Sequence, residues 1–409
     1  MGGFTNVLKN KSAINLQPCI SSPKIYSLVS IPYLCRMKKI GILGGGQLGR
    51  MLLQAAANYP VETFVMENDN DCPAAHLCDH FIQGDIKNFD DVYNFGKALD
   101  AITIEIESVN EEALQRLENE GVKVYPKPSV LKIIKNKILQ KQFYKQYEIP
   151  TAPFEITNNR KDLKNYPALF PAIHKVALGG YDGRGVTALN NPREMLKGFD
   201  EPAVLEKRID IKKEISIIIA CNDKNEIAIY PAVDMIFSPS LNLLSYQVSP
   251  VELDNKILWK AEAMALKVVR NLHSPGIFAV EMFVDYESNV WVNETAPRVH
   301  NSGHHTIEAN YCSQFDMLWR ILLGYPLGNT KAILPSAMIN LIGTEGFSGN
   351  VIYEGLESVL KIENAFVHLY GKKQTRPGRK MGHVTIMSNS MQDLTHTAVI
   401  INKTLKAKA

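Results

Sequence analysis

Two short runs rich in apolar residues that favour strands, 277–284 and 290–294, lie on either side of the polar stretch 286–289. This pattern is typical of a β-hairpin. With the turn between Glu287 and Ser288, antiparallel pairing places Glu281 opposite Glu294. Like charges opposite one another destabilise a sheet, and a hard divalent cation with oxygen ligands offsets the repulsion. The pattern predicts a Mg²⁺ site at Glu281 and Glu294, with Asn293 as a further ligand; a register shifted by one residue would instead turn Glu281 to solvent.

The segment after the second run, residues 296–305, is too polar for a core and contains no acid. It carries Arg298 and His300, together with Asn301, Ser302 and two more histidines. Mg²⁺ commonly retains waters and is completed by substrate phosphates. The hairpin and this segment together therefore favour nucleotide chemistry and an anion site over a closed structural metal site.

The chain from 38 to 68 predicts a strand, a glycine turn, a helix and a second strand. Gly44, Gly46 and Gly49 fit the dinucleotide-binding spacing, and Glu67 lies where an acid would bind a ribose. A glycine turn before a helix will bind any phosphate, so the motif alone is weak. A second unit ends in the apolar run 101–109, where Glu105 is either a substrate contact beyond a strand end or an exposed acid.

Residues 131–147 predict a helix with a stripe of lysines, which is usually a solvated face, and the Pro150 and Pro153 positions mark a boundary. The run 171–186 then predicts strand, glycine loop and strand. Glycine N–H groups can approach phosphate, and Lys175 and Arg184 can neutralise charge during phosphoryl transfer. A plain hairpin is the alternative. Glu206 ends one apolar strand, Glu214 begins another, and residues 255–272 predict an amphipathic core helix.

Beyond Leu334 the pattern predicts a smaller, strand-rich region with a basic cluster at 372–380. The cluster is either a solvated hairpin loop or a site in which Lys372, Arg376 and Arg379 bind one phosphate monoester.

Length and composition narrow the class of protein. The 409 residues, 45% of them hydrophobic, suggest two or three domains. A net charge of +3 and the absence of long apolar runs argue against nucleic-acid or membrane surfaces, and six scattered cysteines fit a reducing compartment. Residues 1–36 contain no acid. They predict either a transit-like segment or, preferably, a disordered or untranslated extension before a start at Met37.

Four stretches taken in order (GGGQLGRM, GGYDGRG, NETAPRVHNSGHH and KKQTRPGRKMGH) resemble the ATP-grasp ligases, and within them the N5-carboxyaminoimidazole ribonucleotide synthetases. The resemblance runs from residue 37 to about residue 400. It implies an α/β fold with a Rossmann-like N-terminal domain (37–136), a central ATP-grasp domain (137–332, lid lobe about 150–208) and a small C-terminal β domain (333–400).

The resemblance implies ATP-dependent carboxylation of 5-aminoimidazole ribonucleotide with bicarbonate, with ATP and Mg²⁺ as cofactors, in a cytoplasmic homodimer. The implied metal ligands are Glu281, Glu294 and Asn293. The implied nucleotide contacts, which include two of these ligands, are Lys137, Lys175, Gly180, Tyr181, Asp182, Gly183, Arg184, Gly185, Val186, Glu206, Lys207, Arg208, Ile209, Glu214, Asn293 and Glu294.

The ribonucleotide is expected between the N-terminal and C-terminal domains. The implied substrate contacts are Gln47, Leu48, Glu105, Tyr181, Arg184, Lys372 and Arg379, and the implied catalytic residues are Asp182, Arg184, Arg298 and His300. The sequence departs from the family pattern at Lys137, where many members have Arg, and at Val176 and Ala177, where basic residues are common; both bear on nucleotide affinity.

The sequence motifs alone are also compatible with three other functions. The first glycine turn allows a nicotinamide-dependent oxidoreductase. The phosphate-binding features also suit a formate-dependent glycinamide ribonucleotide transformylase, or a regulatory ATP-binding module without chemistry.

Overall fold

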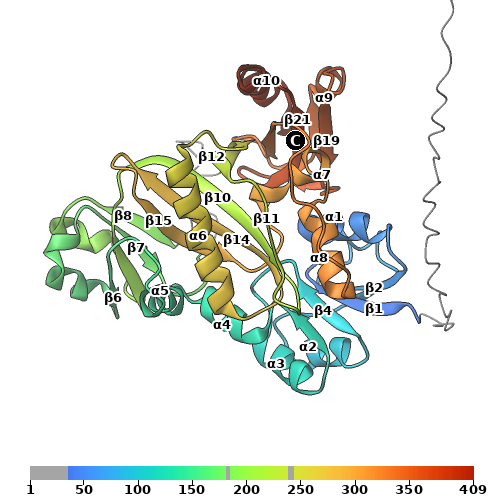
Figure 1. Cartoon of the computed structure of the whole chain (residues 1–409), viewed down its shortest axis with the longest axis horizontal. Coiled ribbons are helices and arrows are strands. Elements are labelled where there is room, and N and C mark those ends of the chain that lie inside the picture. Colours follow the sequence, from blue (N-terminus) through green and yellow to red (C-terminus); the bar gives the residue numbers. More distant parts are fainter. Residues whose placement is uncertain (1–35, 181–184, 238–243) are drawn as a thin grey trace, which may run out of the picture. The chain divides into compact units, whose positions relative to one another are not determined.

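A parallel sheet with flanking helices forms the N-terminal part of the described chain (Figure 1). The computed structural model describes residues 36–180, 185–237 and 244–409. The sheet order is β3-β2-β1-β4-β5, with every neighbouring pair parallel. Its strands are β1 (Lys38–Leu43), β2 (Val61–Glu67), β3 (His80–Gln83), β4 (Ala101–Ile104) and β5 (Lys123–Tyr125), and its helices are α1 (Gln47–Ala56), α2 (Phe89–Gly96) and α3 (Glu111–Asn119).

This arrangement confirms the predicted Rossmann-like topology. After β1 the chain builds β2 and β3 on one side, and then crosses to build β4 and β5 on the other. The ends of β1 and β4 therefore meet at the point where strand order reverses, which is where open α/β sheets bind ligands. The glycine turn follows β1 and Glu105 follows β4, so both lie at this point.

Two helices, not one, occupy the lysine-striped segment. Helix α4 (Pro128–Lys135) stops at Asn136, and α5 (Lys137–Gln146) starts directly after it. The prediction of a single helix over 131–147 is thus wrong at Asn136. Its side chain accepts hydrogen bonds from the N–H groups of Ile138 and Leu139 and caps α5. An Asn that satisfies the free N–H groups of a new helix favours such a break.

A small antiparallel sheet follows, in the order β6-β9-β7-β8. Its strands are β6 (Phe154–Thr157), β7 (Ala172–Val176), β8 (Val186–Leu189) and β9 (Ala203–Lys207), with the short 3-10 helices η1 (Arg160–Asn165), η2 (Pro167–Leu169) and η3 (Pro192–Lys197) between them. Its core is small, built on Leu163, Ala172, Leu189 and Leu205. Lys175 pairs with Val186, so the second glycine loop joins β7 to β8 as predicted.

The largest sheet has nine strands and runs in the order β15-β14-β10-β12-β13-β16-β21-β19, with β11 paired to β10. The strands are β10 (Ile211–Cys221), β11 (Ile227–Ile229), β12 (Val233–Phe237), β13 (Leu244–Ser249), β14 (Gly276–Asp285), β15 (Val290–Ala296), β16 (Ser336–Ile342), β19 (Ala365–Leu369) and β21 (Lys380–Met387). The strands of the C-terminal region therefore extend the same sheet that carries the carboxylate hairpin.

Helices cover both faces of this sheet. Helix α6 (Asn255–Leu272), predicted with these bounds, packs on the face that includes Ile217. Helix α8 (Gln314–Leu323) packs on the opposite face, which includes Ile218, and also contacts α1. The indole of Trp319 on α8 donates to the Leu52 carbonyl of α1 at 2.6 Å. These contacts join the N-terminal sheet to the large sheet.

The remaining C-terminal elements were predicted less well. They are η4 (Asn301–Gly303), α7 (Thr306–Ala309), β17 (Gly349–Asn350), β18 (Ile352–Glu354), α9 (Leu356–Leu360), β20 (Gln374–Thr375), α10 (Met391–Thr404) and β22 (Lys406–Lys408). The strand-rich pattern did not indicate α10, which is rich in β-branched residues of low helix propensity. Its helical spacing of Leu394, Ala398 and Ile401, all buried against the sheet, outweighs that propensity. Within the described ranges, no helix combines the length and apolar character needed to cross a membrane.

Candidate active site

Glu281 on β14 lies opposite Glu294 on β15, as the hairpin pattern predicts. The register arises differently from the expectation, however. Near the turn, Met282 pairs with Val292, so a regular ladder would place Asn293 opposite Glu281. A β-bulge leaves Asn293 without a partner and brings Glu294 to that position. Bulges commonly redirect side chains beside functional sites. The observed register confirms the predicted acidic pair.

The two acids have opposite pKa shifts. Burial, followed by the charges of Glu294 and Glu214, raises the pKa of Glu281, whose side chain is 14% exposed. The Lys137 ammonium, 3.1 Å from Glu294 Oε2, lowers the pKa of Glu294. One acid of the pair therefore carries the negative charge, and the other holds a proton more firmly than an ordinary glutamate. A bound cation would remove that difference, because it favours both ionised forms.

The side chain of Lys175, on β7 of the small sheet, reaches the hairpin. Its Nζ is 3.1 Å and 3.2 Å from the two Glu206 oxygens, and it donates to Asn293 Oδ1 at 3.0 Å. Lys141 Nζ approaches the same Glu206 carboxylate at 3.1 Å. Although burial alone would raise the pKa of Glu206, Lys141 and Lys175 keep it below its ordinary value. Two ammonium groups on one carboxylate leave a net positive charge, which suits a phosphate chain.

Arg298 and His300 follow the end of β15 and contact different parts of the fold. Arg298 Nε lies 2.9 Å from Glu107 Oε1. His300 Nε2 lies 3.4 Å from Glu281 Oε1. Burial lowers the pKa of His300 to about 3, so the ring is neutral and its contact with Glu281 is not an ion pair. A neutral imidazole thus lies beside the acidic pair, while the Arg298 guanidinium, a permanent cation, is paired with Glu107.

The first glycine turn contacts two acids of its own chain. Gly49 N–H donates to Glu105 Oε2 at 2.7 Å, and Gly45 N–H donates to Glu67 Oε2 at 3.0 Å. A Cβ on Gly46 would lie 2.3 Å from Glu105 Oε1, which explains the glycine there. These acids use the N–H groups that a dinucleotide pyrophosphate would need. The turn therefore does not favour the oxidoreductase hypothesis.

Gln47 and Lys372, far apart in the sequence, are in contact. Lys372 Nζ donates to Gln47 Oε1 at 2.8 Å and to the Lys380 carbonyl at 2.8 Å. Leu48, next to Gln47, is buried. Arg379 donates to the Gln374 carbonyl. The structure thus brings one residue from each side of the predicted ribonucleotide site together, whereas a single anion held by Lys372, Arg376 and Arg379 stays a prediction.

The remaining predicted positions lie along the small sheet and its linker. Tyr181, Asp182, Gly183 and Arg184 lie outside the described residues. Gly185 has φ +70°, a left-handed conformation that favours glycine. Lys207 ends β9 and Arg208 follows it, both with exposed side chains, and their N–H groups donate to the carbonyls of Pro153 and Pro171. Gly180, Val186 and Ile209 lie beside these segments, and their predicted ATP contacts stay predictions.

Three residues of the site were not singled out by the sequence pattern. Lys141 belongs to the stripe interpreted as solvated, yet it is 3% exposed and paired with Glu206. Its position four residues after Lys137 puts both on one helix face and was an available signal. Glu107 and Gln314 contact Arg298 and His300 across long sequence separations, for which the sequence holds no local signal.

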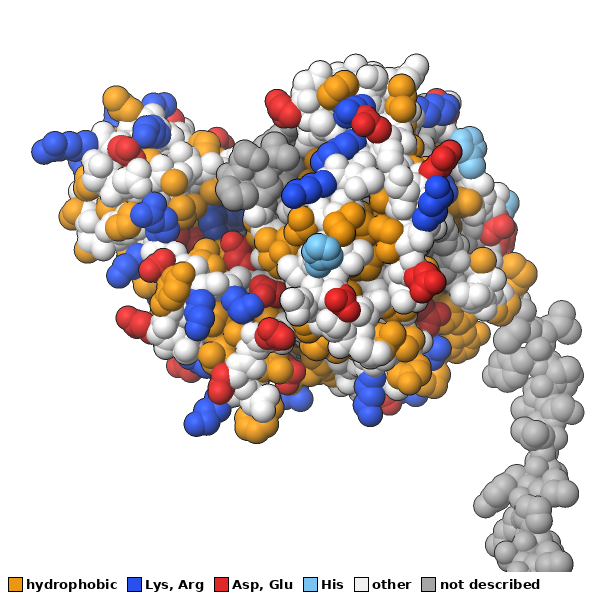
Figure 2. All heavy atoms as spheres, turned by 90° about the horizontal axis from the view of Figure 1, so that it is seen from above, with side chains coloured by type: hydrophobic (Ala, Val, Ile, Leu, Met, Phe, Trp, Pro, Cys, Tyr) orange, Lys and Arg blue, Asp and Glu red, His pale blue; other side chains and the backbone are white. Residues whose placement is uncertain are grey.

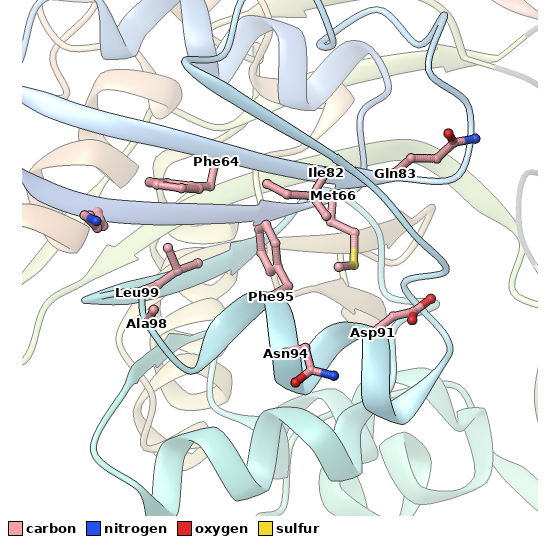
Figure 3. Close-up of a pocket in the computed structure, with 10 residues that line it drawn as sticks. Phe64, Met66, Ile82, Gln83, Asp91, Asn94, Phe95, Ala98 and Leu99 are labelled. Atoms are coloured by element: carbon pink, nitrogen blue, oxygen red, sulfur yellow. The ribbon is translucent and has the colours of Figure 1, made fainter.

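A separate cavity of about 340 Å³ lies in the N-terminal part (Figure 3). Phe64, Met66 and Ile82 from the sheet face Phe95 and Leu99 across it. None of the predicted site residues lines this cavity. The candidate site is instead the surface between the small sheet and the large sheet, where Figure 2 shows basic and acidic side chains close together.

The fold and this site define a class of protein. A Rossmann-like domain, a small sheet with a glycine loop and a larger sheet with paired acids are the parts of an ATP-grasp protein. Three family models agree in chain order: the ribonucleotide synthetase preATP-grasp domain matches residues 37–135, the ATP-grasp domain matches 142–315, and the phosphoribosylaminoimidazole carboxylase C-terminal domain matches 336–397.

Similar proteins narrow the class to a family. The N5-carboxyaminoimidazole ribonucleotide synthase of Staphylococcus aureus (strain COL) is 31% identical over 366 residues, which cover 86% of this chain and 93% of that protein. The crystal structure of the Thermotoga maritima synthetase of this name has a TM-score of 0.85 at 35% identity, covering 91% of this chain and all of that one. The chain belongs to the N5-carboxyaminoimidazole ribonucleotide synthase family. This confirms the resemblance and the predicted fold class.

Two further relatives show which ligands a similar protein binds and how much of a longer relative this chain spans. A synthase from Aspergillus clavatus, crystallised with ADP and 5-aminoimidazole ribonucleotide, has a TM-score of 0.81 at 31% identity, covering 90% of this chain and 99% of that one. The chloroplastic phosphoribosylaminoimidazole carboxylase of Vigna aconitifolia is 34% identical over 377 residues, which cover 88% of this chain. The chain spans 66% of the length of that plant relative.

Proposed function

We propose that the protein carboxylates 5-aminoimidazole ribonucleotide with bicarbonate, converting ATP to ADP and phosphate and yielding N5-carboxyaminoimidazole ribonucleotide in de novo purine synthesis. The observation that carries the proposal is the Glu281–Glu294 pair set between Lys137 on one side and His300 on the other. The relative crystallised with ADP and the aminoimidazole ribonucleotide supports the choice of substrates.

We also propose Mg²⁺ as the metal. Two carboxylates and the Asn293 amide offer the oxygen ligands that it prefers. Burial and the charge of Glu294 raise the pKa of Glu281, and a bound cation would offset both effects. When bound, Mg²⁺ would neutralise charge on the phosphates of ATP. Glu281, Glu294 and Asn293 would hold it. ATP itself is supported by a crystal structure of the Aspergillus clavatus synthase complexed with ATP.

The roles of the other residues follow from their chemistry. Lys175 and Lys137 would bind phosphates of ATP, whose negative charge they complement. Arg298, fixed by Glu107, and His300 would bind the bicarbonate or the carboxyphosphate made from it. Bicarbonate is a poor electrophile, so its activation by phosphorylation requires an anion site beside the nucleotide. Gln47, Glu105 and Lys372 would bind the ribonucleotide at the edge of the N-terminal sheet.

Glu214 is proposed at the ribose of ATP, and Asp182 and Arg184 at the reacting end of the ribonucleotide. From the family resemblance we also propose that the protein is a cytoplasmic homodimer.

Phosphate release measured with ATP and Mg²⁺ tests the proposal, with the aminoimidazole ribonucleotide and bicarbonate each omitted in turn. Release that needs bicarbonate, together with formation of the carboxylated ribonucleotide, is expected. Release that needs formate instead would indicate the glycinamide ribonucleotide transformylase reaction and contradict the proposal.

A further inference from the structure

Gln314, the first residue of α8, holds the backbone of His300 at both ends. Its Oε1 accepts the His300 N–H at 2.8 Å, and its Nε2 donates to the His300 carbonyl at 2.7 Å. The side chain is fully buried. Because a backbone N–H only donates and a carbonyl only accepts, these two bonds allow a single orientation of the amide. His300 is therefore fixed in position by a residue 14 positions later in the chain.

The ring of His300 is fixed as well. Its Nδ1 accepts the backbone N–H of Ser302 at 3.2 Å, as the N-cap of η4. Since that N–H can only donate, Nδ1 accepts and carries no proton, so the ring carries its proton on Nε2. The Ser302 hydroxyl lies 2.9 Å from Nδ1 and 2.8 Å from the Ser216 hydroxyl, both serines being buried. These contacts hold the ring plane.

The protonated nitrogen faces the reaction site. His300 Nε2 lies 3.4 Å from Glu281 Oε1, beside the proposed metal ligands. Space for the supporting amide comes from Gly303, because a Cβ there would lie 2.5 Å from Gln314 Cδ. The residues between Arg298 and Gln314 thus hold His300 so that its Nε2–H group is directed at the acidic pair.

We propose that Gln314 and the Ser302 turn are positioning elements that hold His300 as the Nε2–H tautomer, so that His300 donates a hydrogen bond to an oxygen of the anionic substrate and does not accept the proton of the substrate amine. This inference rests on the proposed function, since it assigns the role of His300 within that reaction. It assigns removal of the amine proton to a group other than His300.

The tautomer can be measured without any activity. Protonated and unprotonated imidazole nitrogens have well separated ¹⁵N chemical shifts, and long-range ¹H–¹⁵N correlation of the full-length enzyme labelled on histidine distinguishes them. His300→Gln identifies the signals of His300. The expected result is protonation on Nε2 only. Protonation on Nδ1 overturns the proposal whether or not the enzyme carboxylates the ribonucleotide.

Two variants separate the contribution of the Ser302 hydroxyl from that of the Gln314 amide to the position of His300. Ser302→Ala keeps the backbone N–H and is expected to keep the Nε2–H signal. Gln314→Met removes both bonds to the His300 backbone at similar side-chain length. It is expected to lower kcat about 10- to 100-fold, as misplacement of a reacting group does, with KM for ATP nearly unchanged. The mixed Nδ1–H and Nε2–H signals of a loosened ring should accompany this loss.

A matched control removes another buried amide nearby. Asn310, at the end of α7, donates to the Thr330 carbonyl at 2.8 Å. Asn310→Ala should lower thermal stability while kcat and the His300 signals stay unchanged. A Gln314→Met enzyme with wild-type kcat and a wild-type His300 signal would show that Gln314 is only structural and refute its positioning role.

Discussion

Glu281 and Glu294 face each other across β14 and β15 because Asn293 is bulged out of the ladder. Burial, followed by the charges of Glu294 and Glu214, raises the pKa of Glu281. Glu281→Gln keeps the size of the side chain and removes both the cost of burying this charge and the repulsion. We expect higher thermal stability than the wild type at alkaline pH without metal, where both acids would otherwise be ionised. We also expect loss of Mg²⁺-dependent stabilisation and a fall in kcat on the order of 100-fold, as for the loss of one charge-stabilising group.

Differential scanning fluorimetry with and without Mg²⁺ and ATP measures the first effect, and phosphate release measures the second. Glu287→Gln, an exposed acid in the turn of the same hairpin, is the control and should change neither. A Glu281→Gln enzyme that keeps full Mg²⁺-dependent stabilisation would remove Glu281 from the ligand set.

Lys141→Met tests the buried cation that the sequence pattern did not reveal. Without Lys141, the buried Glu206 carboxylate keeps Lys175 as its remaining ammonium partner, so Lys175 is held away from phosphate. Breaking a buried ion pair costs about 3–5 kcal/mol when one charge is left behind, and here Lys175 compensates in part. We expect lower stability and a higher KM for ATP.

Lys145→Met provides the matched comparison, since Lys145 is one turn further along α5 and exposed. Its KM for ATP and its melting temperature should match those of the wild type. Equal effects of the two substitutions would assign Lys141 to general helix stability and not to the nucleotide site.

Glu214→Gln should change how stability depends on pH. Burial raises the pKa of Glu214 from 4.5 to about 7, so between these values the folded enzyme binds more protons than the unfolded chain. Wild-type stability therefore falls as pH rises through this window, and the variant lacks that loss. The gain of the variant should be absent below the window, grow across it and level off above, reaching at most about 3 kcal/mol.

Melting temperatures of both proteins without nucleotide, measured across the window, provide the test. A constant difference at every pH would mean that Glu214 titrates normally. Binding of ATP to the same variant, measured by calorimetry, tests the proposed ribose contact independently.

Gly46→Ala should disturb the Glu105 carboxylate, because the added methyl would lie 2.3 Å from Oε1. The backbone of Gly46 has φ −74°, which alanine adopts easily, so the effect is steric. We expect destabilisation of about 1–3 kcal/mol and weaker binding of the ribonucleotide.

A double-mutant cycle with Glu105→Ala separates steric conflict from other causes. In the double variant the methyl has room, so the cost of Gly46→Ala should nearly disappear. Additive effects in unfolding experiments would show that the glycine serves a purpose other than accommodating Glu105.

Local pattern was sufficient for most of the fold and for the acidic pair. The two β-rich runs of the hairpin, the first glycine turn and the amphipathic period of α6 each depend on neighbours in sequence, and each prediction was confirmed. The hairpin register succeeded although the turn was placed differently, because the bulge at Asn293 restored the expected pairing. Pattern alone contains no signal for such a bulge.

The errors have a common physical cause in contacts between distant segments. Lys141 looks solvated by pattern, and only Glu206, 65 positions later on another element, makes it a buried ion. Helix α10 has poor intrinsic propensity and forms because the large sheet buries its apolar face. Gln314 and Glu107 gain their importance from Arg298 and His300, which the fold brings to them.

The continuous ladder from β15 through β13 and β16 to β19 bears on how far the protein can be divided. The family model for the C-terminal domain begins at residue 336, in the middle of a sheet and not at a hinge. A chain truncated there would leave β13 as an open edge with unpaired backbone groups. The C-terminal segment, which matches a family model of its own, is therefore part of this sheet and not an independently folding domain.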